Sequence, residues 1–357
     1  MKGAASVVQR KRLFLFTHPR TASNLLVRIL NLENQPSLRS PDSKTNLGNK
    51  YEYFFVSTQP LRIGLADRSS EEWSQDEQAE MKHQLQVSAD ELRRYIDAAQ
   101  VGGRSVFVKE HLLWMLSPEA EDLVKAGPQK DRFFWKAQFP HDDHTREVIK
   151  SHDDDSAKSP GVRNETVLPD DFLRTLTPTF LIRHPALVFP SLYRTSVDLE
   201  GREEAKKNAN GMFRLEMTFR WTRCLFEWYE TEWKRGETVA APLIIDADDI
   251  ILNPNVVAKY CDLVGLDATK CLLEWERATV EEEGGMNFLE RRMKSSLLAS
   301  TGIIQQGKGA SGLDLGQEAR KWSEELGEEE GKKLLNWISA AMPDYDFLKE
   351  RRLVADG

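Results

Sequence analysis

The sequence predicts an α/β fold in which a central, mostly parallel sheet carries helices on both faces. Short apolar runs with strand propensity alternate along the chain with long amphipathic segments, as they do in βαβ units. Polar clusters directly follow three of the apolar runs. Because ligands of such folds bind at the carboxyl ends of parallel strands, these clusters are the first candidates for a functional site.

The expected strands are four short apolar runs, at residues 13–16, 105–108, 179–182 and 242–245. The first leads through a polar loop into a helical pattern at 25–30, and the third leads into a helix that passes through Ser191 and Tyr193. Long amphipathic helices are expected at about 74–100, 210–235 and 254–264. The aromatic residues of 213–233 fall at helical spacings, which predicts core packing.

The chain of 357 residues is expected to form a single domain over 1–357. Two stretches differ from core sequence and are expected to be surface insertions, at about 35–49 and 139–162. The first is rich in Ser, Pro and Asn, and the second carries the runs HDDH and HDDD. We find no internal repeat and no linker long enough to divide the chain.

Composition excludes several classes of protein. With 40% hydrophobic and 30% charged residues, the chain is globular rather than disordered. A net charge of -8 opposes a general role in coating nucleic acid, and no apolar run approaches the ~20 residues that span a bilayer. The three cysteines form no CxxC pair and suggest neither a disulfide framework nor a zinc site, so we expect a cytoplasmic protein.

The loop from Thr17 to Asn24 is a candidate anion site, because it joins an expected strand to the start of a helix. Backbone N–H groups and hydroxyls at a helix start bind anions, and Arg20 adds a fixed charge. The motif GxxxxGK[ST] is absent, which argues against a nucleoside triphosphatase loop. Taken by itself, the loop is equally consistent with a Pro-containing turn before a well-capped helix.

Three motifs together resemble the sulfotransferases that use 3′-phosphoadenosine 5′-phosphosulfate (PAPS). The run Pro19-Arg20-Thr21-Ala22-Ser23-Asn24 is similar to their 5′-phosphosulfate loop, Pro-Lys/Arg-Ser/Thr-Gly-Thr/Ser-Thr/Ser. It departs from that loop at Ala22, where the family has Gly, and at Asn24, where it has a hydroxyl residue.

The second motif is Arg183, Pro185 and Ser191, which keep the spacing of the family's 3′-phosphate motif. The third is Lys109-Glu110-His111-Leu112, which resembles the Lys-Thr-His-Leu of cytosolic sulfotransferases, where the His is the general base.

Weaker similarities extend the resemblance from Leu13 to about Leu348. Residues 243–249 look like the family's late strand with its acidic end. The run 307–312 resembles the loop that closes over the nucleotide, where the family usually has Arg-Lys-Gly and this chain has Gly307, Lys308 and Gly309.

The resemblance implies the P-loop NTPase-like sulfotransferase fold, PAPS as co-substrate without a metal, and transfer of a sulfuryl group to a hydroxyl or amine of a small molecule. It assigns His111 as the base and Lys109 and Arg20 as the catalytic cations. The donor-binding residues it implies are Arg20, Thr21, Ala22, Ser23, Asn24, Leu25, Arg183, Ser191, Lys308 and Gly309.

The chemistry of these residue types agrees with that assignment. Sulfuryl transfer, like phosphoryl transfer, passes an electrophilic group in line between two oxygens, so the enzyme supplies position and positive charge. An imidazole such as that of His111 can take the proton of an acceptor hydroxyl. A structural role for His111 at a strand end is the alternative.

Other functions are also considered. The scaffold could serve a different reaction or bind a ligand without sulfuryl transfer, and a nucleotide kinase is disfavoured because the Lys-Ser/Thr that positions magnesium is missing. The His/Asp-rich run 141–155 offers metal-ligand chemistry, but a solvated loop bordering the acceptor pocket is the preferred interpretation. The expected partner is a small-molecule acceptor, with no nucleic acid and no membrane. A homodimer is left open.

Overall fold

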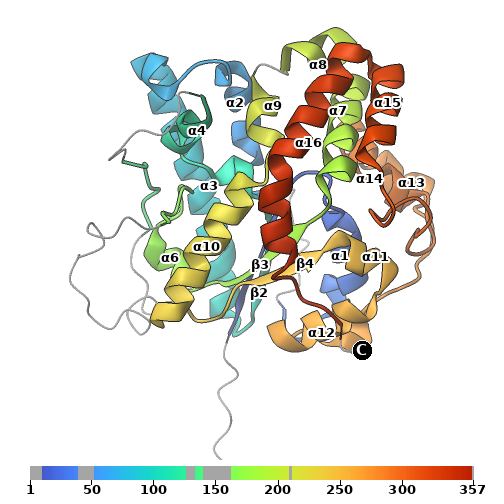
Figure 1. The fold of residues 1–357 in the computed structure, drawn as a ribbon. Helices are drawn as coiled ribbons and strands as arrows, with labels where there is room; N and C mark the ends of the chain where they lie inside the picture. Colours follow the sequence, from blue (N-terminus) through green and yellow to red (C-terminus); the bar gives the residue numbers. More distant parts are fainter. Residues whose placement is uncertain (1–9, 39–51, 126–132, 140–161, 209–210, 356–357) are drawn as a thin grey trace, which may run out of the picture.

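The computed structural model describes residues 10–38, 52–125, 133–139, 162–208 and 211–355 (Figure 1). Most of the insertion expected at 35–49 and nearly all of the one expected at 139–162 lie outside these residues. Within the described part of the chain, no helix is both long enough and apolar enough to cross a membrane.

The centre of the fold is a four-stranded parallel sheet with the order β2-β1-β3-β4. The strands are β1 (Arg12–Thr17), β2 (Val106–His111), β3 (Thr177–Ile182) and β4 (Leu243–Asp246). They confirm the four expected strands. Because β1 is central and pairs with both β2 and β3, its last residue, Thr17, lies beside His111 on one side and Leu181 on the other.

Helices flank the sheet on both faces, as expected (Figure 1). The α-helices are α1 (Ser23–Leu30), α2 (Gln59–Leu65), α3 (Gln75–Val101), α4 (Pro118–Lys125), α6 (Asp170–Arg174), α7 (Pro185–Glu200), α8 (Arg202–Asn208), α9 (Met212–Glu216), α10 (Arg220–Arg235), α11 (Ala247–Leu252), α12 (Asn255–Val264), α13 (Val280–Gly284), α14 (Phe288–Leu298), α15 (Leu315–Leu326) and α16 (Glu328–Lys349). Short 3₁₀ helices cover Leu32–Asn34, Val56–Thr58, Ser70–Glu72, Leu112–Met115 and Ala268–Lys270.

Alternation along β1 divides the core into two layers. Phe14 and Phe16 belong to a large apolar cluster with α3, α7, α10 and α16, whereas Leu13 and Leu15 belong to a smaller one with α1 and α12. Successive side chains of a strand point to opposite faces, so a sheet with both faces buried needs apolar residues at every position. This explains why β1 reads as a continuous apolar run.

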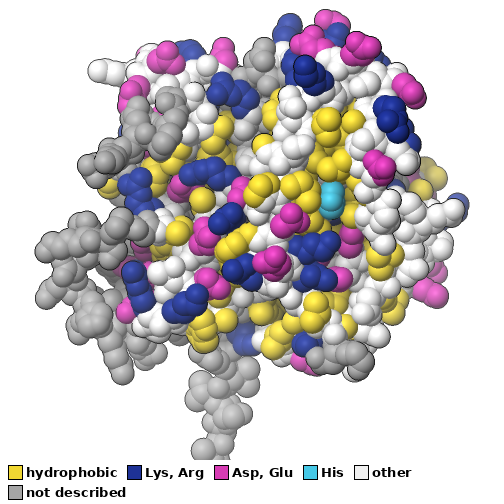
Figure 2. Space-filling model, in the orientation of Figure 1, with side chains coloured by type: hydrophobic (Ala, Val, Ile, Leu, Met, Phe, Trp, Pro, Cys, Tyr) yellow, Lys and Arg dark blue, Asp and Glu magenta, His cyan; other side chains and the backbone are white. Residues whose placement is uncertain are grey.

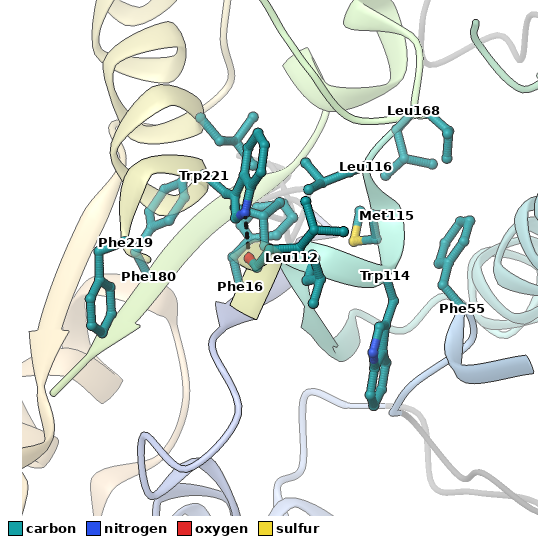
Figure 3. Close-up of a cluster of buried hydrophobic side chains, with 14 of the residues drawn as sticks. Phe16, Phe55, Leu112, Trp114, Met115, Leu116, Leu168, Phe180, Phe219 and Trp221 are labelled. Carbon is teal, nitrogen blue, oxygen red and sulfur yellow. Dashed lines mark hydrogen bonds between the residues drawn. The ribbon is translucent and has the colours of Figure 1, made fainter. Parts of the chain in front are cut away.

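The larger cluster contains the aromatic residues whose helical spacing predicted core packing (Figure 3). Phe16 stacks on Phe180 with ring centroids 5.2 Å apart, and the indole N–H of Trp221 donates to the carbonyl of Leu215 at 2.8 Å. The exception is Trp233, which is 46% exposed.

Two expected elements differ in detail. The helix expected at 210–235 is two helices, α9 and α10, because the backbone leaves the helical region at Met217. The Thr218 hydroxyl accepts a hydrogen bond from the N–H of Arg220, the first residue of α10, at 3.0 Å. The acidic run after β4 does not extend the strand. Instead, Asp246 caps α11 by accepting a hydrogen bond from the N–H of Asp248 at 2.9 Å.

The surface drawn in Figure 2 carries basic and acidic side chains interspersed with each other, with hydrophobic side chains between them. Because the chain as a whole has a net charge of -8, positive charge for an anionic ligand has to come from a local cluster.

Candidate active site

The loop after β1 has the backbone of an anion site. Arg20 and Ala22 both adopt the left-handed region, with φ of 67° and 63°. The carbonyl of Ala22 accepts hydrogen bonds from the N–H groups of Leu25 and Leu26, which starts α1. Among the described residues, the N–H groups of Ala22, Ser23 and Asn24 have no protein partner. Successive N–H groups at such a turn and helix start form a concave anion-binding surface.

Arg20 belongs to a cluster of cations at this loop. Its Nε donates to Ser191 Oγ in α7 at 3.0 Å, and its Nη1 donates to the carbonyl of Met293 in α14 at 3.2 Å. Burial, together with the positive charges of Arg292 and Arg183, lowers the pKa of Arg20 to about 10. The cluster would therefore be stabilised by a bound anion.

Arg183 links the anion loop to the late loop at 307–312. Its Nη2 donates to the carbonyl of Lys308 at 2.9 Å and its Nη1 to the carbonyl of Arg20 at 3.4 Å. Within the described chain, its buried Nε has no hydrogen-bond partner. Burial lowers its pKa, although the carboxylates of Asp248 and Asp246 oppose this effect. An unpaired guanidinium nitrogen beside the candidate anion loop and the late loop is a donor available to a ligand.

His111 ends β2 and is buried beside the anion loop. Its Nδ1 lies 2.7 Å from Thr17 Oγ1, and that hydroxyl also lies 3.0 Å from the carbonyl of Glu110, which can only accept. The hydroxyl satisfies both neighbours only if it donates to the carbonyl and accepts from Nδ1–H. This arrangement selects the tautomer in which Nε2 carries the lone pair.

Burial lowers the pKa of His111 well below its usual value, and the positive charge of Lys109 lowers it further. The imidazole is therefore neutral near pH 7. Its ring packs against two aromatic rings, with centroid distances of 4.7 Å to Tyr53 and 4.7 Å to Trp114, and those two rings also contact each other.

Lys109 is completely buried in the same site. Its Nζ donates to Asn24 Oδ1 at 2.7 Å, forms an ion pair with Glu52, and lies 4.5 Å from the centre of the Tyr53 ring. Burial by itself would lower the pKa of Lys109, but Tyr53 and the Glu52 carboxylate hold it above its usual value. Asn24, which departs from the family's loop, thus supplies an acceptor for this ammonium group.

Glu110 lies between Lys109 and His111 in β2. Its Oε1 accepts the N–H of Phe55 at 3.2 Å, and its Oε2 is buried without a partner in the described chain. Burial raises the pKa of Glu110 to about 8. It is therefore protonated near pH 7 and ties β2 to the segment that carries Glu52 and Tyr53.

The structure brings the predicted site residues together through linked contacts. Ser191 lies against Arg20, Lys308 against Arg183, and Lys109 against Asn24. Gly309 packs against Leu252, and a Cβ added to it would lie 3.0 Å from that side chain. Two predicted donor residues face the protein instead: Thr21 is fully buried with its hydroxyl donating to the carbonyl of His18, and Leu25 packs against the smaller core cluster.

Four residues of the site were not predicted from the sequence, namely Thr17 as a partner of His111, and Glu52, Tyr53 and Trp114. Thr17 directly follows the first expected strand, and a polar residue at a strand end could have been recognised as a site residue from the sequence. Glu52 and Tyr53 reach the site through a pairing across the chain, in which Glu52 bridges to Lys109 and the N–H of Tyr53 donates to its carbonyl at 3.0 Å. No local sequence pattern encodes that pairing.

An open cavity of about 740 Å³ lies between the segments 273–276 and 301–305, and the second of these runs on to Lys308. Trp275 lines it, and the backbone N–H of this residue donates to the carbonyl of Thr301 at 3.0 Å, which joins the two segments. The guanidinium of Arg28 lies 5.9 Å from the centre of the Trp275 ring. This volume is within the range of pockets that bind small molecules.

The described residues contain no group of three or more His, Cys, Asp or Glu side chains that could hold a metal ion. The His/Asp-rich run at 141–155 lies outside them.

Comparison with known proteins identifies the family. No family model matches the chain. The chain is 36% identical over 352 residues to "Sulfotransferase ppzF" of Metarhizium rileyi (strain RCEF 4871), covering 97% of both proteins. It is 35% identical over 363 residues to "Sulfotransferase ppzF" of Metarhizium majus (strain ARSEF 297), covering 99% of this chain and 100% of that protein. Similarity at this level over whole chains, together with the parallel sheet and its anion loop, shows that this chain belongs to the sulfotransferase family.

Proposed function

We propose that this transferase moves a sulfuryl group from PAPS to a hydroxyl, or an amine, of a small molecule, with His111 as general base. The observation that carries the proposal is the position of His111. This residue is the last of β2 and pairs with Thr17, the residue of β1 at which the anion loop begins. Its imidazole is neutral and carries its lone pair on Nε2.

In the proposed reaction, the acceptor oxygen forms a bond to sulfur while the bond between sulfur and the bridging phosphate oxygen breaks. The acceptor proton passes to His111 Nε2, and the electron pair of the broken bond leaves on adenosine 3′,5′-bisphosphate. Lys109 and Arg20 would stabilise the negative charge on the transferring and leaving oxygens. Lys109 is completely buried and Arg20 is half-buried, which strengthens their electrostatic effect.

The donor would be held by two groups of residues. The 5′-phosphosulfate would accept hydrogen bonds from the N–H groups of residues 22–24 and from Arg20. The 3′-phosphate would be bound by Arg183 through its unpaired Nε, with Ser191 and the loop of Lys308 and Gly309 next to it. Phosphate pairs especially well with guanidinium groups, which supports this assignment.

The adenine base would lie in the cavity at Trp275. That cavity is joined to the Arg183 site by residues 301–308, and aromatic side chains stack favourably on nucleotide bases. We further propose a single domain, because the sequence has no linker long enough to divide it, and a cytoplasmic location, because its three cysteines suggest no disulfide framework. The small-molecule acceptor is what the resemblance to sulfotransferases implies.

The proposal is tested by calorimetric titration with adenosine 3′,5′-bisphosphate, followed by assay of sulfuryl transfer from PAPS to a panel of phenols, alcohols and amines in EDTA. We expect nucleotide binding and EDTA-resistant turnover. Absence of nucleotide binding by folded protein would overturn the donor assignment. Binding without transfer to any acceptor class would favour the alternative, a ligand-binding protein on the same scaffold.

A further inference from the structure

Two of the three cysteines lie side by side and take no part in the proposed chemistry of His111. Cys261 Sγ and Cys271 Sγ are 3.5 Å apart and both thiols are free. Cys261 is completely buried in α12, whereas Cys271 is half-buried just after the 3₁₀ helix Ala268–Lys270. The third cysteine, Cys224, belongs to α10.

The chain between the two thiols is folded back by specific interactions. Gly265 ends α12 with a positive φ of 82°, and the N–H groups of Gly265 and Leu266 both donate to the carbonyl of Cys261. Asp267 then caps the 3₁₀ helix by accepting from the N–H of Thr269 at 2.9 Å. The Gln35 side chain holds this turn from outside, since its Oε1 accepts from the N–H of Asp267 at 2.8 Å. The proximity of the thiols is therefore built into the turn.

The environment also makes the two thiols unequal. The hydrogen bond between them lowers the pKa of Cys271 and raises that of Cys261, so Cys271 is the thiol that ionises first. A thiolate is the form that reacts with oxidants, and the partially exposed Cys271 is the one that an oxidant can reach.

We propose that Cys261 and Cys271 form a reversible redox modification site, in which a peroxide converts the two thiols into an intramolecular disulfide. The Cys271 thiolate attacks a peroxide oxygen, the O–O bond breaks, and hydroxide leaves, which produces a sulfenic acid. Cys261 sulfur then attacks the sulfenic sulfur, so that the S–S bond forms, the S–O bond breaks and water leaves with the Cys261 proton. Both sulfurs are oxidised and the peroxide is reduced.

The disulfide between Cys261 and Cys271 would restrain a segment that lies next to the cavity of the proposed nucleotide site. Leu272, directly after Cys271, donates its N–H to the carbonyl of Ile29 at 2.8 Å, and residues 273–276 line the cavity. A disulfide between α12 and Cys271 would fix this connection covalently and restrict the unfolded chain. We expect the oxidised protein to have a higher thermal midpoint than the reduced protein.

The test is thiol counting and peptide mapping on the intact chain. Reduced, desalted protein is treated with one equivalent of hydrogen peroxide, alkylated, denatured and digested with trypsin. Cleavage after Lys259, Lys270 and Arg277 places the two cysteines in separate peptides, 260–270 and 271–277, and Cys224 in 224–234. We expect one free thiol of the three to remain and the first two peptides to be joined until a thiol reductant separates them.

Variants of each cysteine provide the controls. Cys224→Ser should give the same joined peptides with no thiol left, while Cys271→Ser should leave Cys261 unoxidised. Three free thiols after peroxide treatment of the wild type, or a bond that involves Cys224, would overturn the proposal. Because this outcome is read on the wild type, it holds even if a variant fails to fold, and it does not depend on the sulfotransferase activity.

Discussion

The Thr17 hydroxyl lies 2.7 Å from His111 Nδ1 and 3.0 Å from the carbonyl of Glu110, so it donates to the carbonyl and accepts from the imidazole. The two residues are direct neighbours in the sheet, because the last residue of β1 is in register with the last residue of β2. The sheet itself therefore sets both the orientation and the tautomer of His111, and Thr17 is a positioning residue for the proposed base.

Thr17→Val removes the hydroxyl while nearly preserving the shape of the side chain. We expect kcat to fall roughly tenfold, because one hydrogen bond contributes about 0.5–1.5 kcal/mol and 1.36 kcal/mol corresponds to a factor of ten. Nitrogen NMR of His111 should show loss of the single Nδ1–H tautomer. Nucleotide affinity should be unchanged.

Thr17→Ser, which keeps the hydroxyl, should retain most of the activity and the tautomer. Thr179→Val is the matched control, since Thr179 is a buried threonine of β3 whose hydroxyl accepts from Tyr260 at 3.4 Å. If the role of Thr17 were purely structural, Thr17→Val would lower the stability of the protein without changing the tautomer of His111.

Replacement of His111 by Ala should lower turnover by ~10²- to 10⁴-fold, the usual loss for a general base. Affinity for adenosine 3′,5′-bisphosphate should be retained, as measured by calorimetry. If His111→Ala turned over a hydroxyl acceptor at the wild-type rate, the assignment of the base would be wrong.

The wild type should also show a characteristic pH profile. The base must be neutral, and burial lowers the pKa of His111 well below its ordinary 6.5, so the neutral form persists at lower pH. On the acidic side, kcat/KM should therefore fall off only below pH 6.5. A fall-off centred above pH 6.5 would mean that the base of the free enzyme does not have the lowered pKa of a buried imidazole.

The sequence predicted the sheet and the sequential motifs of the site, and it did so for physical reasons. Each strand contains a short buried apolar run, and the site residues lie at strand ends, with His111 closing β2 and Arg20 and Arg183 following β1 and β3. Glu52 and Tyr53 could not be predicted, because their place beside Lys109 depends on a pairing across more than fifty residues. The split between α9 and α10 depends likewise on a local break at Met217 and on the hydrogen bond from the N–H of Arg220 to the Thr218 hydroxyl, inside an otherwise helical pattern.

Arg183 should distinguish nucleotides by their 3′-phosphate. We expect Arg183→Ala to weaken binding of adenosine 3′,5′-bisphosphate by about 1.5–3 kcal/mol, the range of a charge-assisted hydrogen bond. Binding of adenosine 5′-phosphate, which lacks the 3′ group, should change little. The control is Arg194→Ala, because Arg194 pairs with Glu325 on the surface. This variant should bind both nucleotides with unchanged affinity. Equal losses for both nucleotides would place Arg183 elsewhere than at the 3′-phosphate.

Glu110 should make the protein less stable as the pH rises. Burial raises its pKa from 4.5 to about 8 in the folded state. Between these values the folded state holds a proton that the unfolded state has lost, so stability falls with rising pH by up to ~1.4 kcal/mol per unit. Glu110→Gln cannot ionise and should lack this decrease. In urea unfolding, the free energy of unfolding of Glu110→Gln should rise relative to that of the wild type between pH 5 and pH 8.

The control for Glu110 is the exposed Glu281 of α13, where Glu281→Gln should track the wild type at both pH values. A constant difference between Glu110→Gln and the wild type over this range would show that Glu110 is ionised in the folded protein throughout.

Ala22 should be a strained position that glycine relieves. Its φ of 63° and ψ of 26° lie in the left-handed region, which costs a residue with a Cβ about 1–2 kcal/mol. Glycine adopts this conformation freely but adds ~0.4–1 kcal/mol of entropy to the unfolded chain, so Ala22→Gly should give a net gain of about 1 kcal/mol or less. Urea unfolding measures the gain, and Ala98→Gly on the exposed face of α3 should instead lose about 1 kcal/mol. If Ala22→Gly destabilised the protein as much as Ala98→Gly does, the backbone at residue 22 would have to be right-handed. The concave array of N–H groups that supports the anion site would then be absent.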